Sequence, residues 1–76
     1  MMTTVQLIEL INSTLKINLD PHSTPVDETF ASLGIDSLDF FNVLVELETL
    51  TGKKISDAEA QKLVTIQSLV EFCNRS

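Results

Sequence analysis

The sequence predicts an all-α fold: a small four-helix bundle of three main helices and a short third helix. Apolar residues recur at helical spacing in three separate segments, and capping residues bracket each of them. No segment alternates apolar and polar residues as a half-buried strand would. The 76 residues suffice for one domain, 1–76, whose core must be mostly Leu, Ile and Val, because the chain has four Phe and no Trp or Tyr.

The first helix is predicted from about Thr4 to Lys16. Its apolar stripe comprises Val5, Ile8, Ile11 (or Asn12) and Leu15, widened by Leu7. Thr3 or Thr4 can cap its start, because a threonine hydroxyl accepts a hydrogen bond from the first turn.

A connection of about twenty residues, 17–36, follows. Unstructured connections of that length are uncommon in compact domains, so we expect this one to be tethered to the core. Its apolar residues can provide the tether: Ile17, Leu19 and Val26. Segment 28–34 is expected to form a single helical turn, anchored by Phe30 and Leu33 and ended by Gly34.

The second helix is predicted from about Ser37 to Thr51. Asp36 is a favourable N-cap, and Asp39 places an acid in the first turn, where the helix dipole stabilises negative charge. Gly52 is typical of a C-terminal stop, and two lysines follow it near the negative end of this helix.

Two further caps define the rest of the chain. Segment 56–59, Ser-Asp-Ala-Glu, has the pattern of a capping box and opens a short helix predicted from Asp57 to Leu63. Thr65 caps a fourth helix, whose apolar stripe comprises Ile66, Leu69, Val70 and Cys73. Cys73 is the only cysteine, so no internal disulfide is possible, and we interpret it as a packing residue.

The second helix carries two apolar stripes on a wheel of about 3.6 residues per turn. One comprises Phe40, Val43, Leu44 and Leu47, with Leu50 at its margin, and the other comprises Leu38, Phe41 and Val45. One stripe is enough for packing in a small bundle. The second indicates either a central helix buried on most sides or an exposed patch that binds partner proteins. In the latter case its acidic rim would be Asp36, Asp39, Glu46 and Glu48.

The formal net charge is -6, and no Lys or Arg occurs between Lys16 and Lys53. Such an acidic block repels phosphate backbones and anionic lipid, so we expect neither nucleic-acid binding nor membrane insertion, but basic protein surfaces as partners. Alternatively, the acids only keep a small protein soluble. The start of the sequence lacks the features of a signal peptide, and no stretch approaches a membrane span, so a reducing, cytoplasmic location is expected.

No residues form a catalytic or metal-binding constellation. A nucleophilic Ser37 would need a positioned base, and the only histidine, His22, lies in a loop between prolines, where it is most simply solvated. As an attachment point, Ser37 needs only exposure, and a phosphodiester there would lie at a helix N-terminus, which favours anions. Asp36 and Asp39 oppose this by repulsion. Asp-Ser-Leu-Asp can also be nothing more than a helix start.

The stretch 33–39, Leu-Gly-Ile-Asp-Ser-Leu-Asp, resembles the attachment motif of acyl carrier proteins. The similarity continues through the second helix, segment 52–59 and segment 65–69, and covers the chain from about residue 5 to residue 73. The resemblance implies a four-helix fold and a 4′-phosphopantetheine arm attached to Ser37 by a phosphopantetheinyl transferase. It also implies that acyl groups are carried as thioesters on this arm, by a protein that is not an enzyme.

The resemblance further implies that the second helix recognises partners, namely acyl-transferring and ketoacyl-synthase-type enzymes with basic docking patches. The apolar contacts would be Leu38, Phe41 and Val45, and the acidic rim would be Asp36, Asp39, Glu46 and Glu48. A monomer is expected. An acyl chain could lie among the helices, lined by Phe40, Leu44 and Leu47, or Phe40 could fill that space itself.

Some positions differ from the family's fatty-acid carriers. Asn42 stands where these usually have an acid, and Phe40 and Phe41 are bulkier than the usual residues. These differences leave open a specialised carrier for polyketide or modified-lipid synthesis beside a fatty-acid carrier. An aminoacyl or peptidyl carrier is a further alternative, against which Asp36 argues. The alternative outside the carrier proteins is an acidic helical interaction module without a prosthetic group.

Overall fold

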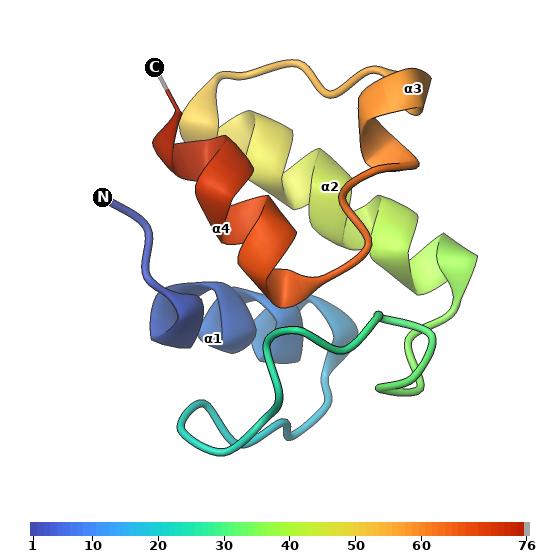
Figure 1. Ribbon diagram of the computed structural model, residues 1–76. Coiled ribbons are helices and arrows are strands. Elements are labelled where there is room, and N and C mark those ends of the chain that lie inside the picture. The colour runs from blue at the N-terminus through green and yellow to red at the C-terminus, as the bar shows by residue number, and fades with distance from the viewer. Residues whose placement is uncertain (76) are drawn as a thin grey trace.

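The computed structural model describes residues 1–75 and confirms the all-α prediction. These residues form four helices: α1 (Thr4–Leu15), α2 (Ser37–Thr51), α3 (Asp57–Ala60) and α4 (Ile66–Asn74). Helix α1 contacts both α2 and α4, and α3 is a single turn on the return from α2 to α4 (Figure 1). Within the described part of the chain, no helix is long and apolar enough to cross a membrane.

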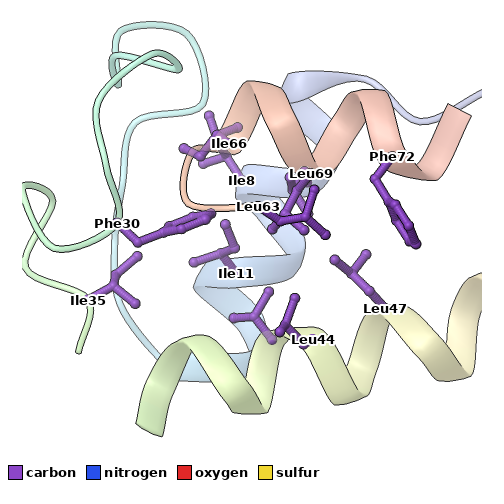
Figure 2. Packing of buried hydrophobic residues seen from close by; sticks show 12 residues of the cluster. Ile8, Ile11, Phe30, Ile35, Leu44, Leu47, Leu63, Ile66, Leu69 and Phe72 are labelled. Atoms are coloured by element: carbon purple, nitrogen blue, oxygen red, sulfur yellow. The ribbon is translucent and has the colours of Figure 1, made fainter. Parts of the chain in front are cut away.

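The core lies where the three longer helices and the 17–36 connection converge (Figure 2). Each element contributes aliphatic or aromatic side chains, and no polar side chain is buried among residues 1–75. The buried residues are Leu7, Ile8 and Ile11 from α1, Val43, Leu44 and Leu47 from α2, Ile66, Leu69 and Phe72 from α4, and Phe30, Ile35 and Leu63 from the connections.

Helix α1 begins at a capping box. The Thr3 hydroxyl accepts from the Gln6 backbone, and the Gln6 side chain accepts from the Thr3 backbone. The helix ends one residue before the predicted Lys16, because Lys16 adopts a left-handed conformation with a φ of 58°. Beyond this bend, the side-chain amide of Asn12 makes two hydrogen bonds of 2.8 Å to the backbone of Leu19, which fold the connection back along α1.

The long connection is tethered, as predicted. Its side chains pack against the core at Ile17, Leu19, Val26 and Leu33. Its backbone is also bound to the segment before α4, since the Phe30 N–H donates to the Val64 carbonyl over 2.9 Å. Residues 30–34 form the predicted single turn, in which the Leu33 N–H donates to the Thr29 carbonyl over 3.2 Å, and Gly34 ends it with a φ of 84°.

Helix α2 has the predicted bounds because both ends are specified by capping residues. Asp36 caps its start, and Gly52 ends it in the left-handed conformation, with a φ of 72°. The first apolar stripe faces the core with Val43, Leu44 and Leu47, while Phe40 is half-buried against it.

The last two helices differ from prediction in detail. Helix α3 ends at Ala60 rather than Leu63, because the chain turns there and directs Leu63 into the core. The predicted stripe of α4 was incomplete: Phe72 is buried, whereas Val70 and Cys73 are only half-buried. The core of α4 therefore lies toward its Ile66–Leu69–Phe72 side.

Candidate functional site

Ser37 is exposed at the first position of α2, next to a buried anchor. Two residues earlier, the Ile35 side chain is buried and its N–H donates to the Phe30 carbonyl over 2.9 Å. Gly34 makes the bend between the turns of the connection and this anchor. Burial of Ile35 therefore fixes the chain immediately before the helix and leaves Ser37 facing solvent.

The start of α2 has free backbone donors. The Asp36 carboxylate accepts from the Asp39 N–H over 2.8 Å, and the Asp36 carbonyl accepts from the Phe40 N–H over 2.9 Å. Within residues 1–75, the N–H groups of Ser37 and Leu38 donate no hydrogen bond. Unpaired N–H groups and the helix dipole stabilise an anion at this end, whereas the carboxylates of Asp36 and Asp39 repel it.

An apolar groove opens beside Ser37. It has a volume of about 360 Å³. Its lining residues come from the connection, the start of α2 and the segment before α4: Thr29, Phe30, Ala31, Ile35, Asp36, Ser37, Phe40 and Val64. The exposed hydroxyl, the two free N–H groups and this groove together fit a phosphate-linked organic arm attached at Ser37.

Sequence reasoning did not identify most of the groove. Thr29 and Ala31 lie in the turns of the connection, and Val64 lies 27 positions beyond Ser37 in the sequence. The hydrogen bond from Phe30 to Val64 brings these segments together. A tertiary contact of this kind leaves no periodic pattern, so the only signal was an apolar Val64 directly after Leu63, the predicted end of the short helix.

The second stripe of α2 is exposed. The exposed fractions of Leu38, Phe41 and Val45 are 69%, 59% and 43%. The alternative that α2 is buried on most sides is therefore wrong, and the stripe forms an apolar patch on the same helix as Ser37. Of the predicted acidic rim, Asp36 and Glu46 are exposed, while Asp39 and Glu48 are half-buried.

Glu48 has a structural partner. Its carboxylate accepts a hydrogen bond of 2.7 Å from the Ile55 N–H, in the loop from α2 to α3. The carboxylate thus holds this loop against α2, which the sequence did not indicate because the partner is a backbone group seven residues away. Its role in an acidic rim stays a prediction.

The remaining reactive side chains lie apart from this site. The exposed His22 follows Asp20, whose carboxylate accepts the His22 N–H over 2.9 Å, and this bond lowers the pKa of Asp20. Cys73 is half-buried on α4, and burial raises the pKa of its thiol. No group of three or more His, Cys, Asp or Glu in residues 1–75 is arranged to hold a metal ion.

Comparison with known proteins agrees with this geometry. Residues 5–73 match the family model described as the phosphopantetheine attachment site. The chain is also 37% identical over 60 residues to an acyl carrier protein of Thermosynechococcus vestitus, an alignment that covers 78% of this chain and 74% of that protein. The chain therefore belongs to the acyl carrier protein family, whose cofactor is phosphopantetheine and whose members are carriers rather than catalysts.

Proposed function

We propose that the chain carries acyl intermediates as thioesters on a 4′-phosphopantetheine arm joined to the Ser37 hydroxyl by a phosphodiester. The observation that carries this assignment is the exposure of Ser37 at the N-terminus of α2, beside two unpaired N–H groups. These N–H groups would stabilise the phosphodiester, and the arm, when bound, supplies the thiol that holds the acyl group. A phosphopantetheinyl transferase is the enzyme class that would attach it.

The chain's own residues then present the cargo to other proteins. The exposed stripe of Leu38, Phe41 and Val45 would make short-range apolar contacts, and the neighbouring carboxylates of Asp36, Asp39 and Glu46 would steer a basic surface toward it. The expected partners are acyl-transferring and ketoacyl-synthase-type enzymes with basic docking patches. Such contacts should be weak and salt-sensitive, because a carrier must leave each enzyme after delivery.

We infer a carrier for a fatty-acid, polyketide or specialised lipid pathway. Asn42 and Phe41 are both exposed on α2, so the surface offered to partners has one acid fewer and one aromatic ring more than the resemblance to fatty-acid carriers would suggest. This difference supports a dedicated pathway with its own partner enzymes. It acts on partner choice rather than on attachment of the arm.

The test is the intact mass of the protein before and after incubation with coenzyme A and a broad-specificity phosphopantetheinyl transferase. We expect the gain of one phosphopantetheine, which Ser37→Ala abolishes. Ser32→Ala is the matched control, because Ser32 is also exposed but lies in the turns before α2, and this variant should gain the arm normally. A folded wild-type protein that gains no mass would favour the other candidate, an interaction module that uses the exposed stripe without a prosthetic group.

A further inference from the structure

The groove beside Ser37 ends at a pair of aromatic rings. Phe30 and Phe40 line it and lie with their ring centroids 5.0 Å apart, at an interplanar angle of 36°. Phe30 is buried and extends from the connection toward the core, as Figure 2 shows. Both rings therefore belong to the core and to the groove at once.

Behind these rings the core is closed. Leu44 and Leu47, which lie one and two turns beyond Phe40 on α2, are 6% and 0% exposed, and neither lines the groove. The sequence left two alternatives for this region: a chain-binding space lined by Phe40, Leu44 and Leu47, or a space filled by Phe40. In the structure Phe40 lines the groove and packs against the buried Phe30, whereas Leu44 and Leu47 are buried in the core and do not line the groove, which favours the second alternative.

The backbone of both aromatic residues is held by hydrogen bonds. The Phe30 N–H donates to Val64, and the Phe30 carbonyl accepts from Ile35 and Leu33, over 2.9, 2.9 and 3.1 Å respectively. Phe40 is fixed in the first turn of α2 by its own N–H bond to the Asp36 carbonyl. These hydrogen bonds fix the backbone positions from which the two rings extend, and the rings pack against each other.

We propose that Phe40, held by Phe30, determines which acyl chains this protein can shelter. The inference rests on the proposed attachment of the arm at Ser37. A short acyl group can fold back into the groove, whereas a long chain cannot reach the space between the helices and stays in solvent. The protein is thus selective for short cargo, and Phe40 sets the limit.

The experiment compares butyryl, octanoyl and dodecanoyl forms, each loaded on the arm and verified by intact mass. The acyl chain carries a ¹³C-labelled terminal methyl group, and nuclear Overhauser contacts from this methyl to the methyls of Leu44 and Leu47 report entry into the core. We expect no such contacts for the dodecanoyl chain in the wild-type protein. We expect them in Phe40→Ala, in which the space of the ring becomes available.

A second readout is the rate at which hydroxylamine cleaves the thioester. In the wild-type protein, the octanoyl and dodecanoyl rates should agree within about twofold, because cleavage follows the population of the exposed form. In Phe40→Ala, the dodecanoyl rate should fall at least about threefold for the same reason. Leu50→Ala is the control: it truncates an exposed apolar side chain near the other end of α2, outside the groove and outside the stripe of Leu38, Phe41 and Val45, and should leave both readouts unchanged.

The outcomes separate this inference from the proposed function. Failure of the mass gain at Ser37 would overturn the attachment site and this inference with it. A correctly loaded wild-type protein whose dodecanoyl methyl contacts Leu44 or Leu47 would overturn the role of Phe40 alone. If Phe40→Ala does not fold, Phe40→Leu opens a smaller space, and a folded variant of either kind that behaves like the wild-type protein would also overturn it.

Discussion

At the scale of single residues, Glu48 combines a predicted surface role with an observed structural one. The sequence places it in an acidic rim, whereas the structure pairs its carboxylate with the Ile55 N–H over 2.7 Å. A half-buried donor that loses its acceptor is only partly compensated by water. The first contribution of Glu48 is therefore to hold the loop after α2, whatever it adds to docking.

We expect Glu48→Ala to lower the free energy of unfolding by about 1 kcal/mol, because the Ile55 N–H then lacks its partner. Glu48→Gln should recover most of the loss, since the amide oxygen can accept the same bond. Glu46→Ala, on the exposed side of α2, should change stability by less than about 0.5 kcal/mol. Urea unfolding of the three variants measures this. Equal stability of Glu48→Ala and Glu46→Ala would show that the Ile55 bond contributes nothing.

Cys73 gives a prediction about pH. Burial raises the pKa of its thiol, and the nearby charge of Lys53 opposes this only in part. We expect iodoacetamide at neutral pH to alkylate the folded protein more slowly than the urea-unfolded chain, because only the thiolate reacts. Since the folded pKa lies above the unfolded value of about 8.5, Cys73 stabilises the fold below that pH and this contribution declines above it. Folded and unfolded chains alkylated at the same rate would contradict this prediction, and Cys73→Ser should remove all labelling.

At the scale of elements, capping residues made the helix starts predictable. Asp36 and Gly52 define α2 to the residue, and the Ser56 and Thr65 caps place the starts of α3 and α4. These signals are local, because a cap bonds to the backbone within its own first turn. The end of α3 and the burial of Phe72 were not predictable in this way, since both follow from how the returning chain fits against the other helices.

Helix α4 ends in a contact that the sequence does not reveal. The Lys53 ammonium donates to the carbonyls of Phe72 and Cys73 over 3.1 and 3.2 Å and also to that of Arg75, and it lies 5.6 Å from the centre of the Phe72 ring. This lysine directly follows Gly52 at the end of α2, as predicted, and its ammonium also satisfies the last carbonyls of α4, about twenty residues away, where a positive charge is favoured.

We therefore expect Lys53→Met to lower the free energy of unfolding by about 1 kcal/mol, because the stem still covers Phe72 while the carbonyl bonds are lost. Lys54→Met is the matched control, since Lys54 is exposed and should matter by less than about 0.5 kcal/mol. Urea unfolding gives the stabilities, and hydrogen exchange should accelerate in the last turn of α4 in Lys53→Met alone. Identical behaviour of the two variants would refute this role of Lys53.

At the scale of the whole molecule, the bounds of α2 and its exposed stripe followed from the sequence, but the groove did not. Ser37 and Phe41 belong to one helix, so their relative placement follows from its period. The groove requires Phe30, Phe40 and Val64 to meet from three elements. Such a meeting depends on the path of the 17–36 connection, which periodicity cannot specify. The groove is thus a property of the fold.

The acidic charge of the chain should affect fold stability and partner docking in opposite ways when salt is added. The net charge of -6 and the absence of Lys and Arg between Lys16 and Lys53 concentrate repulsion in the folded chain. From about 0.1 M to about 1 M sodium chloride the Debye length falls from about 10 to about 3 Å, so the repulsion is screened. We expect stabilisation on the order of 1 kcal/mol, seen as a rise of about 4–8 °C in Tm by circular dichroism.

Docking should respond in the reverse direction, because screening also removes the attraction between the acidic rim and a basic partner. Over the same salt range, arm attachment by a phosphopantetheinyl transferase should show a rising KM while the carrier itself becomes more stable. A Tm that does not change with salt would show that the acidic block does not stress the fold. A KM that stays constant while Tm rises would show that the acids act on stability alone, and recognition would then rest on the apolar stripe of Leu38, Phe41 and Val45.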